Sequence, residues 1–198
     1  MNDVKLFEAL FSIISPDEKR PELKGVYHCD GYLIAASQYI LAKVHFEDYD
    51  FDFEGQIIGP DGSSIPMKFP LTKHLLKDVI SEMHELRDEY ANAITVANRN
   101  LPKGSRKDND RVLLEVEEEK LHTFELAKLF EVFGVLGETP SLFFGKTRNP
   151  VLLKSPSCTA FIMPDYSELA PEDLLFTVDQ ALRIDLPKLL FNAYKVPQ

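Results

Sequence analysis

Two stretches decide the fold, KLFEALF at residues 5–11 and AKLFEVF at residues 127–133. Each places apolar side chains at helical spacing, which is typical of an amphipathic helix that buries one face. Each is followed by a short proline-containing turn, RPEL at residues 20–23 and TPSL at residues 139–142, and then by several short apolar runs. A helix-plus-strands unit that occurs twice predicts two similar layers that close on a shared core.

The first unit is punctuated by strong local signals. We expect a helix over Asp3–Ser15, where a wide apolar face ends at a proline. An Asp-Gly pair at residues 30–31 lies between two apolar runs, which predicts a hairpin over residues 26–36. A third strand is expected over Tyr39–Phe46, and the turn residues at 59–62 predict a second hairpin.

Residues 47–54 alternate acidic and aromatic side chains, and two interpretations compete. The acids have the alternate spacing of a calcium loop, but an EF-hand loop needs glycine at its sixth position and glutamate at its twelfth. Counted from Asp48, those positions hold Phe53 and Gly59. We therefore favour a strand with its aromatic side chains turned inward.

Between the two units, residues 75–97 have apolar side chains at three- and four-residue spacing, which predicts a long helix with a narrow seam. That seam packs either on its own domain or on a partner helix or symmetry mate. Residues 98–111 form the basic cluster of the chain, which is either a solvated connector or a surface that touches phosphates. The candidate nucleic-acid contacts are Arg99, Lys103, Arg106, Lys107 and Arg111.

The second unit is expected to begin with a strand and to end with a tail. Thr123 is positioned to cap its helix. The expected elements are a strand at 112–117, a charged turn at 117–120, a helix at 124–135, strands at 141–144, 151–154 and 158–163, and tail elements at 174–178 and 186–194.

Composition narrows the class of protein. The 198 residues are 44% hydrophobic and 27% charged, as in a globular chain, and no apolar run reaches the roughly 20 residues of a membrane span. The net charge of −10 argues against broad, nonspecific nucleic-acid binding. Cys29 and Cys158 lie far apart in apolar stretches, which favours two buried free thiols over a bridge. With no signal sequence at the N-terminus, this indicates a cytoplasmic location.

We predict no catalytic residue, cofactor or metal site. The five histidines lack metal-ligand spacing, and His28 and Cys29 are neighbours on a strand, so they point to opposite faces. Glycine fingerprints for nucleotides and the nucleophile elbow are both missing from the sequence. An unrecognised hydrolase is the remaining enzymatic alternative, and a deep pocket with converging histidine and acidic side chains would be its sign.

Five short segments, in this order and spacing, resemble the bacterial DNA sliding clamp, the processivity subunit of DNA polymerase III. They are RPELKGV at 20–26, LIAASQYILA at 33–42, the stretch 62–70 that ends in KFP, NPVLL at 149–153 and FIMP at 161–164. The resemblance covers roughly residues 4–70 and 112–164.

This resemblance implies an α+β fold, a single DNA-clamp-like domain of two helix-plus-antiparallel-strands repeats with a helical insertion. The boundaries it implies are repeat one at about 1–71, the insertion and basic loop at about 72–111, repeat two at about 112–164, and a C-terminal tail at 165–198. Clamp subunits carry three such domains, whereas this chain has room for one. The first half also lacks a leading strand, and we expect the tail strand at 174–178 to take that place.

The resemblance also implies where to look for function. Clamp helices line a DNA channel with basic side chains, but here they offer Asp3, Lys5 and Glu8 in the first helix and Glu125, Lys128 and Glu131 in the second. The peptide-binding cleft of the family lies beside its terminal segment, which Met163 and Pro164 match. We therefore expect a non-catalytic clamp-like interaction module linked to DNA replication or a mobile element, or a protein-binding or self-associating domain that uses this fold without DNA.

Overall fold

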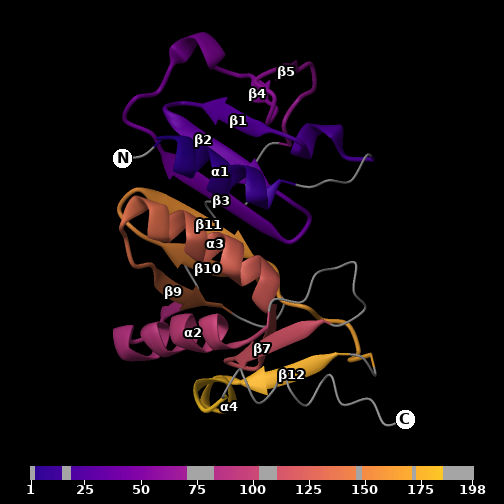
Figure 1. The fold of residues 1–198 in the computed structure, drawn as a ribbon, viewed down its shortest axis with the longest axis vertical. Helices are drawn as coiled ribbons and strands as arrows, with labels where there is room; N and C mark the ends of the chain where they lie inside the picture. Colours follow the sequence, from indigo (N-terminus) through magenta and orange to yellow (C-terminus); the bar gives the residue numbers. More distant parts are fainter. Residues whose placement is uncertain are drawn as a thin grey trace, which may run out of the picture.

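The computed structural model describes residues 3–14, 19–70, 83–102, 111–145, 149–170 and 173–184. A large antiparallel sheet forms the centre of the molecule, with helices on one of its faces and a smaller sheet at one end (Figure 1). None of the helices in these ranges is long and apolar enough to cross a membrane.

Nine strands make up the large sheet, in the order β5-β4-β1-β2-β3-β11-β10-β9-β6. Their bounds are β1 Val26–Cys29, β2 Tyr32–Ala36, β3 Ile40–His45, β4 Ile57–Ile58, β5 Ser64–Ile65, β6 His84–Glu85, β9 Ser141–Phe144, β10 Val151–Lys154 and β11 Cys158–Ile162. The expected strands and hairpins at 26–46, 56–65 and 141–163 are all present. At the first hairpin, Asp30 and Gly31 both have positive φ (52° and 78°), as the two-residue turn requires.

The order of the strands is symmetric about the centre of the sheet. The triplet β1-β2-β3 meets the triplet β11-β10-β9 through an antiparallel pair of β3 and β11, in which Ala42 lies opposite Ala160. Each triplet follows a helix in the chain, α1 (Asp3–Ile13) before the first and α3 (Thr123–Leu136) before the second. The fold is therefore α+β, with two helix-plus-antiparallel-strands units.

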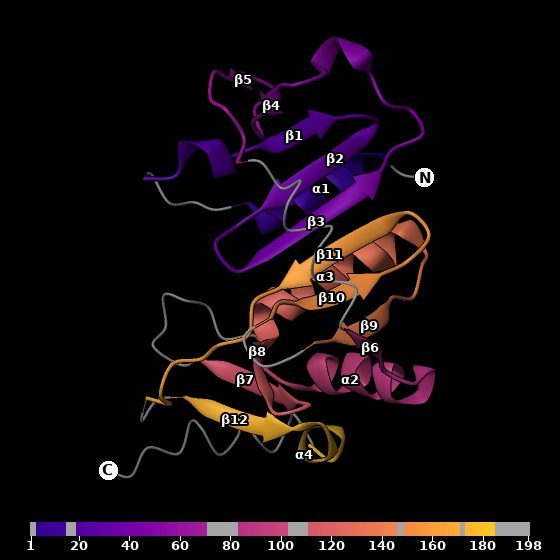
Figure 2. The same cartoon turned by 180° about the vertical axis from the view of Figure 1, so that it is seen from behind.

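Helices α1 and α3 lie side by side on one face of the large sheet (Figure 1). Leu6, Leu10 and Ile13 of α1 are fully buried, and so are Leu126 and Leu129 of α3. They pack on the inward side chains of the strands to form the main core. The opposite face of the sheet is visible in Figure 2, and none of the described α-helices covers it.

The smaller sheet has the order β12-β7-β8 and sits beside two further helices. Its strands are β7 Val112–Val116, β8 Glu119–His122 and β12 Leu174–Thr177, and the helices are α2 Asp88–Asn100 and α4 Val178–Leu182. The expectation that the tail strand completes the first half was wrong. It runs parallel to β7 in the second half instead, with Leu174 opposite Val112.

The expected long helix at 75–97 was also wrong. Residues 75–82 lie outside the described residues, β6 at 84–85 pairs with the edge strand β9, and Arg87 has an extended backbone. Helix α2 begins only at Asp88. Backbone pairing with β9 has overridden the helical pattern there. The buried residues of α2, among them Ala91 and Ile94, pack in the core of this chain rather than on a partner helix.

Two other local expectations were wrong. Residues 47–54 form a loop with a short 3₁₀ helix (η2, Phe51–Phe53) and not a strand, because the side chain of Asp50 accepts a bond from the Asp52 N–H and closes a turn. The charged turn expected at 117–120 comprises only Glu117 and Glu118, which both have positive φ. Strand β8 begins at Glu119.

Thr123 does not cap α3, contrary to expectation. It occupies the first helical position, and His122 is the N-cap residue without a side-chain capping bond. The Thr123 hydroxyl is fully buried within hydrogen-bond distance of the carbonyl oxygens of Val112 and Pro102 (3.2 and 3.3 Å). It therefore ties α3 to the small sheet rather than to its own first turn.

Candidate functional site

An apolar pocket lies on the sheet face opposite α1 and α3. It has a volume of about 190 Å³. Its lining residues are Arg20, Leu23, Ala36, Ser37, Gln38, Tyr39, Ile40, Leu41, Phe69, Pro70, Phe161 and Met163. Most of them come from the first half of the chain, while Phe161 and Met163 come from the second. Residues from both halves of the chain therefore build this hollow.

The turn between β2 and β3 shapes one wall of the pocket. The Ser37 N–H donates to the carbonyl oxygen of Ile40 (2.8 Å), and the Ser37 hydroxyl accepts from the N–H groups of Tyr39 and Ile40 (both 3.2 Å). This local network fixes where β3 starts. Because side chains alternate along a strand, Ile40 packs in the core on the helix side while also bordering the pocket, and Leu41 packs with the cluster on the pocket side.

Met163 closes the pocket from the second half. Its N–H donates to the carbonyl oxygen of Tyr39 (2.7 Å), which extends the β3–β11 pairing by one bond beyond the strand. The Met163 side chain is 37% exposed and lines the pocket. Pro164, the other predicted cleft residue, is buried and does not line it.

Phe69 and Leu23 supply the buried part of the lining. Phe69 is 6% exposed and stacks on the Tyr27 ring at 4.8 Å with an interplanar angle of 4°. Leu23 ends the 3₁₀ turn η1 (Pro21–Leu23), whose proline pre-sets the backbone for such a turn. Beside it, the Arg20 guanidinium lies at the rim and contacts the Glu22 carboxylate at 2.6 Å.

The chemistry of this pocket is that of a side-chain receptor. Its volume is below the roughly 300–1,000 Å³ of most small-molecule sites and suits one or two apolar side chains. Its described lining includes neither a histidine nor an acid, so the converging groups that would indicate a hydrolase do not meet there.

The predicted nucleic-acid contacts do not form a described surface. Lys103, Arg106 and Lys107 lie outside the described residues, and Arg99 is exposed in the last turn of α2. Arg111 is engaged within the protein. Its guanidinium makes two 2.6 Å bonds to the Asp173 carboxylate and one of 3.2 Å to Asp165.

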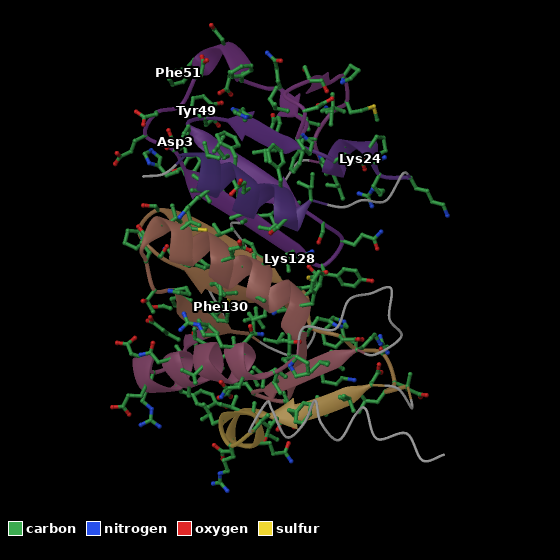
Figure 3. The ribbon with its side chains drawn as sticks, viewed as in Figure 1. Asp3, Lys24, Tyr49, Phe51, Lys128 and Phe130 are labelled. Carbon is green, nitrogen blue, oxygen red and sulfur yellow. The ribbon has the colours of Figure 1, made fainter. Side chains whose placement is uncertain are left out.

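The outward face of α1 and α3 is not basic. Within their bounds the two helices carry two lysines against four acids. Lys128 of α3 is labelled in Figure 3. Its ammonium lies 3.4 Å from the Glu125 carboxylate and 4.4 Å from the centre of the Phe124 ring, so it is partly neutralised. A phosphate backbone would find little attraction on this face.

The two cysteines are free thiols, as expected, but only Cys158 is buried. Burial raises the pKa of the Cys158 thiol to about 12. Cys29 is half-buried, and its sulfur lies within 4.8 Å of carboxylate oxygens of Asp30 and Glu54. These groups already bond to one another and to the chain, because Glu54 accepts from the Asp30 N–H at 3.1 Å and from the Tyr49 hydroxyl. The arrangement holds the β1–β2 turn, and we assign no metal to it.

Sequence reasoning found Met163 but missed most of the pocket. Leu41 and Phe161 lie directly opposite each other across β3 and β11, a register that the sequence does not display. The available signal was alternation. Since Ile40, Ala42 and Val44 form the core face of β3, Leu41 had to point to the other side, where a large apolar residue is unexpected without a partner.

Two helix-plus-strands units joined through β3 and β11 form the architecture of a DNA clamp. No protein-family model matches the chain, and no curated protein matches it in sequence. Among solved structures, the β sliding clamp of Caulobacter crescentus superposes with a TM-score of 0.58 at 14% identity, over 84% of this chain and 64% of that one. That structure is described as having PEG bound to a putative β-motif tethering region.

Two other sliding clamps agree. The clamp of Bartonella birtlesii bound to griselimycin has a TM-score of 0.55 at 11% identity, over 83% of this chain and 64% of that one. The DNA polymerase III β subunit of Thermotoga maritima has a TM-score of 0.55 at 12% identity, over 84% and 63%. The chain spans less than two thirds of the length of these clamps. The chain thus has the bacterial sliding-clamp fold, as its sequence motifs predicted.

Proposed function

We infer that the chain is a non-catalytic, clamp-like interaction module that binds an apolar segment of a partner protein in the pocket around Met163. The observation that carries this proposal is the pocket itself, an apolar hollow on a sheet face that none of the described α-helices covers (Figure 2). Its lining includes Met163, which matches the segment beside the peptide-binding cleft of the clamp family. Burying the exposed apolar side chains of such a hollow under a partner side chain lowers the free energy and favours binding.

The fold adds support for a role linked to DNA replication. Two of the solved clamps that share it are described as β subunits of DNA polymerase III, and a third is described with PEG bound at a putative β-motif tethering region. The lack of a basic face on α1 and α3 favours the version of this role in which the chain contacts proteins rather than DNA. A link to replication would then run through the partner that the pocket binds.

The test is selection of peptides from a phage-displayed random library on the full chain, with counter-selection on the variant Met163→Glu. The variant places a carboxylate in the apolar pocket, which should weaken the selected peptides at least about tenfold. Val96→Glu is the matched control, since Val96 is similarly exposed (44%) on α2 and should leave binding unchanged. Failure to enrich any peptide, or equal binding to Met163→Glu, would overturn the proposal.

A further inference from the structure

A second, polar hollow lies on the same sheet face as the apolar pocket. Its volume is about 470 Å³. It is lined by Tyr32, Lys43, His45, Lys154, Ser155, Pro156, Ser157, Cys158 and Thr159. None of these described lining residues is an acid, although the chain as a whole has a net charge of −10. The polar hollow of this acidic protein is therefore lined by two lysines and a histidine, with no acid among its described lining residues.

Strand register makes the two hollows neighbours. Leu41 and Lys43 are two residues apart on β3 and point to the same face, which places their side chains about 7 Å apart along the strand. On β11, Phe161 lies opposite Leu41 and Thr159 lies opposite Lys43. The sheet face therefore carries an apolar band directly beside a band of lysine and threonine side chains, which we call the basic band.

The basic band extends across two strand spacings. Thr159 pairs with Lys43 on one side and with Lys154 on the other, so the two lysines are about 10 Å apart with a threonine hydroxyl between them. The Lys43 ammonium lies 3.8 Å from the centre of the Tyr32 ring, which holds it over the sheet. Side chains that are held in place lose less entropy when they pair with an incoming charge.

The acid beside the hollow is already satisfied. Glu138 accepts from the Ser157 N–H (3.2 Å), the Ser157 hydroxyl (2.8 Å) and the Ser155 hydroxyl. The hydrogen bonds from these two serines lower the pKa of Glu138 although burial acts against them. Its carboxylate closes the 155–157 turn and does not pair with either lysine among the ion pairs of the described residues.

We propose that the partner of this module is an acidic peptide segment, with an apolar anchor side chain in the Met163 pocket and one or more carboxylates over Lys43 and Lys154. This proposal rests on the proposed function, because it names the chemistry of the segment that the pocket binds. An extended strand advances about 3.3 Å a residue, so the carboxylates fall roughly two to four residues from the anchor. Charge complementarity selects this occupant over a basic or neutral segment.

The experiment uses the peptides selected on the full chain. Asp and Glu should be enriched two to four positions from the apolar anchor, and binding should weaken as salt rises from 50 to 500 mM, a range across which charges at about 10 Å become screened. Lys43→Glu and Lys154→Glu should each weaken binding roughly three- to tenfold. Lys5→Glu is the matched control, since it makes the same charge change on α1 at the other sheet face and should change nothing.

The outcomes separate the two proposals. Peptides that need Met163 but show neither acidic enrichment nor weakening by the Lys43 and Lys154 variants would overturn the acidic-segment proposal alone. Peptides insensitive to Met163→Glu would overturn the proposed function as well. Circular dichroism and thermal unfolding of Lys43→Glu and Lys154→Glu verify the fold, and both should resemble the unsubstituted chain because these side chains lie on the outward face of the sheet.

Discussion

The N–H of Met163 donates a hydrogen bond to the carbonyl oxygen of Tyr39 at 2.7 Å. The bond joins the end of β11 in the second half to the β2–β3 turn in the first, beside the apolar pocket. A partner that fills the pocket therefore contacts both halves at once, and the pocket depends on the β3–β11 pairing. The contribution of single residues to the stability of the fold and to the pocket can therefore be measured by substitution.

Phe69 should be the most sensitive residue of the pocket wall. Phe69→Ala removes a ring that is 6% exposed and stacked on Tyr27, so the free energy of unfolding should fall by about 3 kcal/mol. Urea denaturation followed by circular dichroism measures it. Phe51→Ala, at a ring that is 72% exposed, should stay within about 0.5 kcal/mol of the unsubstituted chain. Equal effects of the two variants would contradict the packing described here.

Arg111 should stabilise the tail at neutral pH. Its hydrogen bonds to Asp173 lower the pKa of that carboxyl. A carboxyl whose pKa is lowered on folding stabilises the protein above its unfolded pKa, and this contribution is lost as the pH falls through the folded pKa.

Arg111→Met should therefore cost about 1–2 kcal/mol at pH 7 and much less near pH 2. Thermal unfolding across this pH range measures both. Arg99→Met, at an exposed arginine of α2, serves as the control, with an expected effect within about 0.5 kcal/mol. A loss that is the same at both pH values would contradict the role of the ion pair.

His28 should be a destabilising residue in its present site. It is 5% exposed, both of its ring nitrogens lack a hydrogen-bond partner among the described residues, and it lies among the rings of Phe7, Tyr49 and Phe53. Burial lowers its pKa, so the folded protein loses stability as the pH falls below about 6.5.

His28→Leu removes the unpaired polar atoms and should raise the free energy of unfolding by about 1 kcal/mol. The gain should grow between pH 7 and pH 5, because the leucine cannot take up a proton. Chemical denaturation at the two pH values measures this, and a variant that is less stable at both would contradict the account.

The two thiols should differ in reactivity. Cys158 is buried with its pKa raised to about 12, so in the folded protein it should not react with a thiol reagent at pH 8. Cys29 is half-buried and should react slowly, because burial also raises its pKa. Absorbance with a disulfide reagent measures one thiol in the native chain and two in denaturant. Cys29→Ser should leave none reactive in the native chain.

Duplex DNA should bind weakly. The face of α1 and α3 lacks the positive charge needed for phosphate contacts, so we expect a Kd of about 10⁻⁴ M or weaker at physiological salt. Fluorescence anisotropy with a labelled duplex measures it, and light scattering shows whether the mass changes with DNA. Tight, salt-sensitive DNA binding that is lost when Arg99, Arg106 and Lys107 are replaced by glutamate would instead establish the predicted basic contacts.

The sequence predicted those parts of the fold that rest on local signals. The hairpin at residues 30–31 has its turn chemistry written in two adjacent residues, and α1 and α3 have clear periodicity. The errors came where distant contacts decide. The residues 84–85 became a strand because β9 offers an open edge, and Thr123 serves the small sheet rather than its own helix.

The candidate site was less predictable for the same reason. Met163 could be found because a sequence motif marks it. Leu41, Phe69 and Phe161 also lie in the resembling segments, but their shared position at the pocket could not be predicted. The pairing of β3 with β11 sets Leu41 opposite Phe161, and Phe69 joins them from a distant part of the chain. The basic band of Lys43 and Lys154 is likewise invisible in a chain whose net charge is strongly negative.

The most direct test of the central claim is methyl NMR of the chain labelled at its methionines, titrated with the tightest-binding selected peptide. Four methionines are present, and Met163 lines the pocket while Met83 does not. We expect the Met163 methyl resonance to shift and saturate with the peptide while the Met83 resonance stays in place. A Met163 resonance that does not move while the peptide binds would contradict the assignment of this pocket as the docking site.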